Sequence, residues 1–294
     1  SDASACGNET ASDQPMMRKF MIESVLYWAN EYHIDGFRFD LMAIHDIETM
    51  NELTAALKRN NPNTIVYGEG WTAGDSPLPF EKRALKAHTF DMAELSAFSD
   101  DLRDALKGSV FEIDSTGFVS GASGIEESVK FGVVGSIAHP QVNAGAVNYS
   151  DQPWANQPWQ SVAYVSCHDN NTIFDKIEIS RSDATREEQV AMTKLANAVV
   201  LTSQSIAFLH AGAEMLRTKG GNHNSYNSPD SINQIDWNWK SENIEVVDYY
   251  KNLIALRKQH PAFRMRTANE VQSNLEFIMP GLNGSAMYLM ANGS

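Results

Sequence analysis

Short apolar segments that end in a carboxylate recur along this chain, and they constrain its fold more than any other feature. Three of these segments lead into Asp40, Glu69 and Asp169. Helical patterns separate them, and a strand that alternates with helices predicts βα units around a parallel sheet. The carboxyl ends of such strands converge on one face, so we expect the three carboxylates to meet there.

The first of these segments, residues 34–41, also carries an arginine. Apolar and aromatic side chains alternate along it, and Arg38 and Asp40 stand two residues apart. A strand has a side-chain period of two, which places both charges on one side. Opposite charges at the end of an apolar strand suit a ligand site at the mouth of an α/β sheet. A purely structural ion pair explains this stretch equally well.

Periodicity and turn residues predict the remaining elements. Apolar residues that recur every three or four positions predict helices at 15–32, 50–58, 100–107, 185–202 and 246–259. In the first of these helices, Phe20 and Trp28 belong to the expected apolar face. Apolar runs predict strands at 34–40, 64–69, 95–98, 161–167 and 205–209. Residues 109–160 show no period, and we expect an irregular insertion that forms a wall of a binding site.

Composition excludes several classes of function. The 294 residues carry a formal charge of −14, which argues against nucleic acid and anionic membranes as partners. No run of eighteen apolar residues occurs, so we expect no membrane-spanning segment. The two cysteines, Cys6 and Cys167, predict neither a disulfide framework nor a metal cluster, and they do not indicate a compartment.

Carboxylates that converge in this way suit the cleavage of glycosidic bonds. One attacks the anomeric carbon, one protonates the leaving oxygen, and a third can orient sugar hydroxyls. We expect Arg38 to keep Asp40 ionised, and burial with crowding to keep Glu69 protonated. The alternative is three unrelated loop acids. No metal motif occurs, although loop acids such as Asp151 leave room for a structural calcium ion, and we expect no cofactor in the chemistry.

Three motifs resemble signature regions of the α-amylase clan, in order and in spacing. They are Asp35-Gly36-Phe37-Arg38-Phe39-Asp40, Gly68-Glu69-Gly70-Trp71 and Val165-Ser166-Cys167-His168-Asp169-Asn170. The Gly-Trp pair after Glu69, the segment 74–79 and Asn224-Ser225-Tyr226-Asn227-Ser228-Pro229-Asp230 resemble type I pullulanases, the α-1,6 debranching enzymes of that clan. The likeness extends over nearly the whole chain.

The resemblance implies a role for each matching residue. It makes Asp40 the nucleophile, Glu69 the general acid/base and Asp169 the transition-state stabiliser. It also implies that substrate is bound by Arg38, His168, Trp71 and Tyr226, with Trp71 stacking on a glucose ring.

The resemblance further implies a partial (β/α)8 barrel that consists of its later strands, about the fourth to the eighth. We expect the barrel part at 1–262, with the insertion at 109–160, and the beginning of a β-sandwich-like domain at 263–294. The clan's first signature region has no match before Asp35, so we expect a piece of a longer enzyme.

The function that this sequence predicts is a retaining α-glucan debranching hydrolase. Its substrates would be the α-1,6 bonds of pullulan, glycogen and branched dextrins. The alternatives are a relative that hydrolyses α-1,4 bonds, and a carbohydrate-binding relative without catalysis. The isolated chain could be inactive in every case, because five strands leave open sheet edges.

Overall fold

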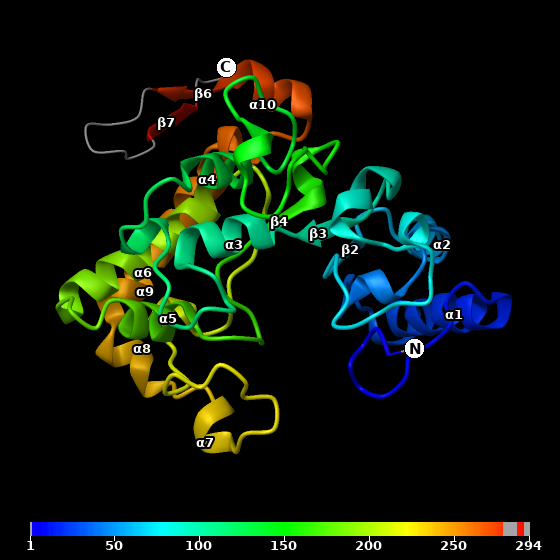
Figure 1. Ribbon diagram of the computed structural model, residues 1–294, viewed down its shortest axis with the longest axis horizontal. Helices are drawn as coiled ribbons and strands as arrows, with labels where there is room; N and C mark the ends of the chain where they lie inside the picture. The colour runs from blue at the N-terminus through cyan, green and yellow to red at the C-terminus, as the bar shows by residue number, and fades with distance from the viewer. Residues whose placement is uncertain (1, 279–286, 291–294) are drawn as a thin grey trace. The chain divides into compact units, whose positions relative to one another are not determined.

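The computed structural model describes residues 2–278 and 287–290, and these residues form two compact units (Figure 1). The first unit holds the described residues up to Phe98, together with 154–156 and 160–162. The second unit holds the other described residues.

Within the described residues, five strands form one parallel sheet in the order β1-β2-β3-β4-β5. They are β1 Gly36–Phe39, β2 Ile65–Gly68, β3 Ser96–Phe98, β4 Ser161–Ala163 and β5 Ile206–Ala207. Each strand lies inside the range predicted for it but is shorter. A parallel sheet that keeps sequence order needs a crossover after each strand, and this agrees with the predicted partial βα barrel.

Among its described residues, the first unit has the α-helices α1 Pro15–Tyr32 and α2 Ile47–Asn60, and they pack against each other (Figure 1). The Asp46 carboxylate accepts a hydrogen bond from the backbone N–H of Thr49 and caps α2, a contact worth about 1 kcal/mol. The expected apolar face of α1 is only partly buried. Met21 and Val25 are buried, whereas Phe20 and Trp28 are 65% and 48% exposed.

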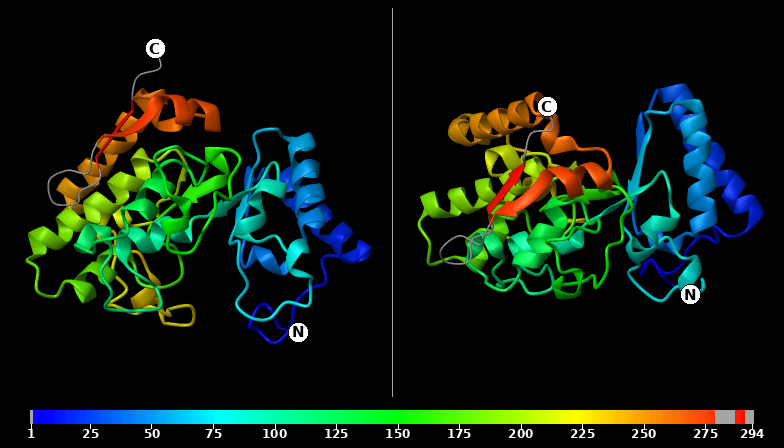
Figure 2. Two further views of the ribbon diagram at one scale, coloured as in Figure 1. Left: turned by 45° about the horizontal axis from the view of Figure 1, so that its top comes forward. Right: turned by 90° about the horizontal axis from the view of Figure 1, so that it is seen from above.

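The second unit is mainly helical. Its helices are α3 Asp100–Lys107, α4 Glu126–Val133, α5 Ile173–Ser180, α6 Arg186–Thr202, α7 Asp230–Asn233, α8 Asn238–Glu242, α9 Ile244–Gln259 and α10 Ala268–Asn274. Figure 2 shows α6 and α9 side by side, and both contribute to one apolar core. The buried members of that core are Phe174, Leu201, Leu216, Val246 and Tyr250.

Two predicted regions differ from the structure. Residues 109–160 include α4, so the expected absence of regular structure is wrong there. Gly132 interrupts the apolar pattern of α4 because it packs closely on α3: a Cβ at this position would lie 2.5 Å from Leu102. After residue 262 comes α10 and then an antiparallel pair, β6 Leu275–Ile278 and β7 Met287–Met290. Part of the range 263–294 lies outside the described residues, and the β-sandwich-like domain expected there stays a prediction.

Candidate active site

Arg38 and Asp40 form the first part of the site, at the carboxyl end of β1. Their side chains lie on the same side of the strand, as predicted, and Nη1 of Arg38 donates to Oδ1 of Asp40. The guanidinium also lies 5.7 Å from the ring centroid of Phe98 in β3. The Asp40 side chain is 63% exposed and that of Arg38 is 25% exposed. The carboxylate therefore has an adjacent cation and remains open to solvent.

Glu69 is brought to this pair by the register of the sheet. Phe39 pairs with Gly68, so the next residue of each strand, Asp40 and Glu69, leaves the sheet beside the other. Nη2 of Arg38 donates to Oε1 of Glu69 at 2.6 Å, so a single guanidinium bridges both carboxylates. Glu69 is only 4% exposed. The two acids thus contact the same guanidinium, but Asp40 is exposed to solvent and Glu69 is buried.

The backbone after Asp40 supplies a second donor to Glu69. The N–H of Leu41 donates to Oε2 of Glu69 at 2.9 Å, and Leu41 has a φ of 43°, in the left-handed region. Burial favours the neutral form of Glu69, whereas this N–H and Arg38 favour its carboxylate. The expectation of a protonated Glu69 stays a prediction.

The glycines on either side of Glu69 allow close packing of backbone around it. A Cβ at Gly68 would lie 2.8 Å from the carbonyl oxygen of Phe39, and one at Gly70 would lie 2.3 Å from the backbone nitrogen of Lys86. A larger residue at position 68 would push the Glu69 segment away from β1, and one at position 70 would push it away from the backbone of Lys86. Trp71, the predicted stacking residue, follows as a half-buried side chain in the same unit.

His168 and Asp169 follow β4 and belong to the second unit. Nε2 of His168 lies 3.4 Å from Oδ1 of Asp169, and these side chains are 54% and 60% exposed. Asn170, the next residue, has a left-handed φ of 60°. Tyr226 lies in a loop of this unit and is 81% exposed. Each of these three predicted side chains is thus accessible to a ligand.

Sequence reasoning missed a group of buried charged residues in the second unit. The charges of 100–107 look like a solvent-facing helix surface, yet Asp101, Arg103, Asp104 and Lys107 of α3 are all buried. Burial, followed by the nearby charge of Arg103, lowers the pKa of Lys107 to about 7.

Cys167 is partly buried beside this group. Burial alone would raise the pKa of its thiol, but the hydrogen bond with His168 and the charge of Lys107 leave that pKa below its ordinary value.

Asp151, the loop acid considered for calcium, is exposed. A calcium site stays a prediction.

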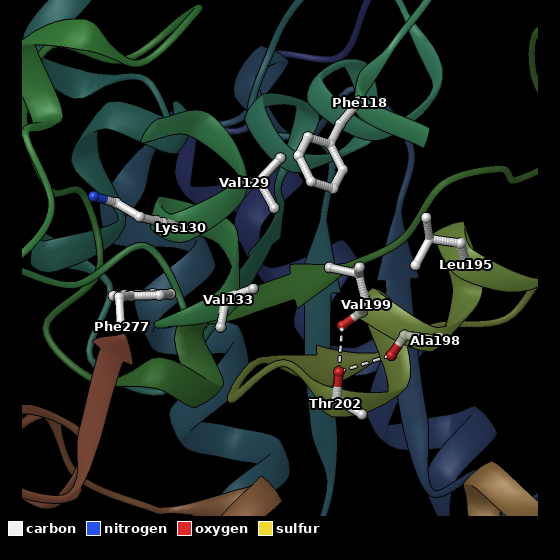
Figure 3. Close-up of a pocket in the computed structure, with 9 residues that line it drawn as sticks. All are labelled: Phe118, Val129, Lys130, Val133, Leu195, Ala198, Val199, Thr202 and Phe277. Atoms are coloured by element: carbon white, nitrogen blue, oxygen red, sulfur yellow. Dashed lines mark hydrogen bonds between the residues drawn. The ribbon is translucent and has the colours of Figure 1, made fainter. Parts of the chain in front are cut away.

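An apolar pocket of about 210 Å³ lies on the second unit, between α4, α6 and β6 (Figure 3). Val129, Val199 and Phe277 line it, and Lys130 is the titratable side chain among the described residues that line it. None of the predicted site residues contributes to it. Among the described residues, no helix is both long and apolar enough to cross a membrane.

Comparison with known proteins finds relatives along almost the full chain. No protein-family model matches it. The pullulanase of Bacillus subtilis strain 168 is 39% identical over 276 residues, which are 94% of this chain and 37% of the relative. The chloroplastic pullulanase 1 of Arabidopsis thaliana is 29% identical and covers 94% of this chain and 34% of its own length.

Solved structures give the same result. The pullulanase of Paenibacillus barengoltzii in complex with maltohexaose and α-cyclodextrin has a TM-score of 0.88 and 49% identity, over 95% of this chain and 42% of that one. The pullulanase of Bacillus acidopullulyticus has a TM-score of 0.89 and 42% identity, over 96% of this chain and 33% of that one. This chain thus spans about two fifths or less of the proteins that it matches.

Proposed function

We propose that this chain, which is a homologue of pullulanases over nearly its whole length, supplies the catalytic carboxylates of a retaining α-glucan debranching hydrolase. The bond cleaved is the α-1,6-glucosidic linkage of pullulan, glycogen and branched dextrins. The observation that carries this proposal is the guanidinium of Arg38, which joins an exposed Asp40 to a buried Glu69.

In this proposal the five strands are the later strands of a (β/α)8 barrel, about its fourth to eighth. The barrel part occupies 1–262, and a β domain begins at 263–294. The parallel order of the sheet supports the first assignment. The antiparallel pair β6–β7 supports the second.

Asp40 acts as the nucleophile. Arg38 donates a hydrogen bond to its carboxylate, and the exposure of Asp40 leaves an oxygen accessible to the anomeric carbon of a bound sugar. Attack on that carbon forms a glycosyl ester while the bond to the leaving oxygen breaks. The negative charge of Asp40 is lost in this step, while the hydrogen bond from Arg38 to Glu69 can remain.

Glu69 acts as the general acid and then as the general base. Its carboxylic acid gives a proton to the leaving oxygen in the first step and takes one from the attacking water in the second. Burial on a tight backbone suits this role, because it raises the cost of the charged form before substrate binds. Retention of configuration requires carboxyl groups about 5–5.5 Å apart.

The remaining residues bind the sugar. Asp169 stabilises the transition state by accepting hydrogen bonds from ring hydroxyls, and His168 donates to the same sugar. Trp71 and Tyr226 offer aromatic faces on which glucose units stack.

Analysis of the products from pullulan tests this function. Pullulan contains both α-1,6 and α-1,4 linkages, and the full-length protein that contains this chain should release maltotriose. Release of panose or isopanose would assign it to the relatives that cut α-1,4 bonds. Binding of pullulan without any new reducing ends would assign it to the non-catalytic carbohydrate-binding proteins.

A further inference from the structure

The segment His168–Asn171 leaves β4 with two exposed side chains and a left-handed residue, but its backbone is held at both ends. Buried lysines supply both of these contacts. In addition, the side-chain amide of Asn171 donates to the carbonyl oxygen of Gly221 at 2.9 Å. The exposed His168 and Asp169 are therefore carried on a backbone that is anchored from beneath.

Lys107 anchors the far end of the segment. It lies in the last turn of α3, is 1% exposed, and its Nζ donates to the carbonyl oxygen of Asn171 at 3.2 Å. An ammonium group is costly to bury, and an apolar side chain of similar volume would fill the same space at lower cost. Packing alone therefore does not account for a lysine here.

Lys219 anchors the near end and connects it to a second loop. Its Nζ donates to the carbonyl oxygen of His168 at 3.1 Å and to the hydroxyl of Ser225 at 2.7 Å. Ser225 is the residue before Tyr226. The backbone N–H of Lys219 donates in turn to Oδ2 of Asp175 at 2.8 Å, which fixes this lysine to α5. One ammonium group thus joins two segments with exposed side chains.

We propose that Lys107 and Lys219 are positioning residues for sugar binding: together they fix the backbone that carries His168 and Asp169, and Lys219 couples this backbone to the Tyr226 loop. This inference rests on the proposed function, because it assigns the fixed side chains to a bound glucan. Neither lysine touches the sugar in this account. Both act through the geometry of the segment.

Lys176 provides a matched control within the same unit. It is also 1% exposed, and its Nζ donates to the carbonyl oxygens of Ser109, Glu112 and Ile113. It therefore anchors a different loop by the same chemistry. A substitution that acts only through lost stability should have similar effects at all three lysines.

The experiment compares Lys107→Met, Lys219→Met and Lys176→Met in the full-length protein. Both kcat and KM on pullulan are measured, together with the midpoint of thermal unfolding. The first two variants should lose on the order of ten- to a hundredfold in kcat/KM, while Lys176→Met should stay within about twofold, because misplacement of a sugar-binding group costs rate. The unfolding midpoints of the three variants should shift by similar amounts, because each variant replaces a buried ammonium group with an apolar side chain of similar volume.

Alkylation of Cys167 by iodoacetamide gives a readout that does not depend on activity. Cys167 precedes the segment and is partly buried, and the exposed Cys6 serves as an internal standard. Peptide mass spectrometry should show a faster reaction of Cys167, relative to Cys6, in the Lys107 and Lys219 variants only. Loss of the Lys107 charge by itself would slow this reaction, because it raises the pKa of the thiol, so a faster reaction reports an opened segment.

The outcomes separate the two levels of the account. If the wild-type protein does not cleave pullulan, the proposed function fails and the alkylation rates alone decide the role of the lysines. If a lysine variant does not fold, the variant Ser225→Ala tests the inference instead, because it removes one of the hydrogen-bond acceptors of Lys219. If kcat/KM and the alkylation rate of Cys167 are then unchanged in Ser225→Ala, the inference is overturned. The inference is also overturned if all three lysine variants behave alike in both assays.

Discussion

Arg38 donates to Asp40 and to Glu69 at the same time, the latter at 2.6 Å, so one cation holds two acids of opposite exposure. Only a planar guanidinium can make two such contacts in fixed directions, since an ammonium group is a point charge. The difference between the acids therefore arises from burial around a shared partner.

Substitution of Arg38 by lysine should separate this bridging role from charge alone. Arg38→Lys keeps one positive charge but replaces the two separate donors Nη1 and Nη2 with a single ammonium nitrogen on a shorter side chain, so kcat on pullulan should fall on the order of a hundredfold. Arg18 bridges Glu48 and Glu52 elsewhere in the same unit and supplies the control variant, Arg18→Lys. If both variants have the same kcat, the Arg38 bridge is structural only.

The left-handed backbone at Leu41 leads to a second prediction. Leu41→Val places a β-branched residue at a φ of 43°, where it is strained by roughly 1–3 kcal/mol, while Leu41→Asn tolerates this conformation. The valine variant should turn the backbone N–H away from Glu69 and lose about tenfold in kcat. Equal kcat values for the two variants would show that this N–H does not act on Glu69.

His45 predicts how the stability of the first unit depends on pH. Burial lowers the pKa of this imidazole to about 4, against an opposing effect of Asp46, and its Nδ1 has no hydrogen-bond partner among the described residues. In the unfolded chain the imidazole of His45 takes up a proton as the pH falls through about 6.5, whereas in the folded chain it does so only near pH 4. Stability is therefore lost as the pH falls from about 6.5 to about 4, by roughly 1.4 kcal/mol per pH unit.

Chemical denaturation across this pH range measures the effect. His45→Gln should flatten the slope, because glutamine binds no proton. The exposed His33, which has a left-handed φ of 55°, gives the control His33→Asn, and its slope should match the wild type. A His45→Gln variant with the wild-type slope would show that the buried imidazole is not the cause.

Local sequence patterns predicted the strands and the pairing of Arg38 with Asp40, because alternation within one strand fixes which side chains share a side. The contact of Arg38 with Glu69 could not be predicted in this way. It depends on the register that pairs Phe39 with Gly68, and register is set by contacts between distant segments.

Local sequence patterns also failed to predict the buried charged residues of the second unit. The charges of 100–107 follow the pattern of an exposed helix, yet Arg103 and Lys107 are buried because each has a partner from a distant segment. Arg103 donates to the hydroxyl of Tyr164, and Lys107 donates to the carbonyl oxygen of Asn171. Neither partner can be identified from the sequence of α3.

Trapping of the glycosyl–enzyme ester tests the central claim most directly. In the Glu69→Gln variant of the full-length protein, a 5-fluoro-α-glucosyl fluoride can still react, because fluoride leaves without an acid, while hydrolysis of the ester lacks its base. Peptide mass spectrometry should then find one added sugar, on Asp40. A sugar on Asp169 or another carboxylate, or no adduct together with products of inverted configuration, would contradict the assignment of Asp40 as the nucleophile of a retaining hydrolase.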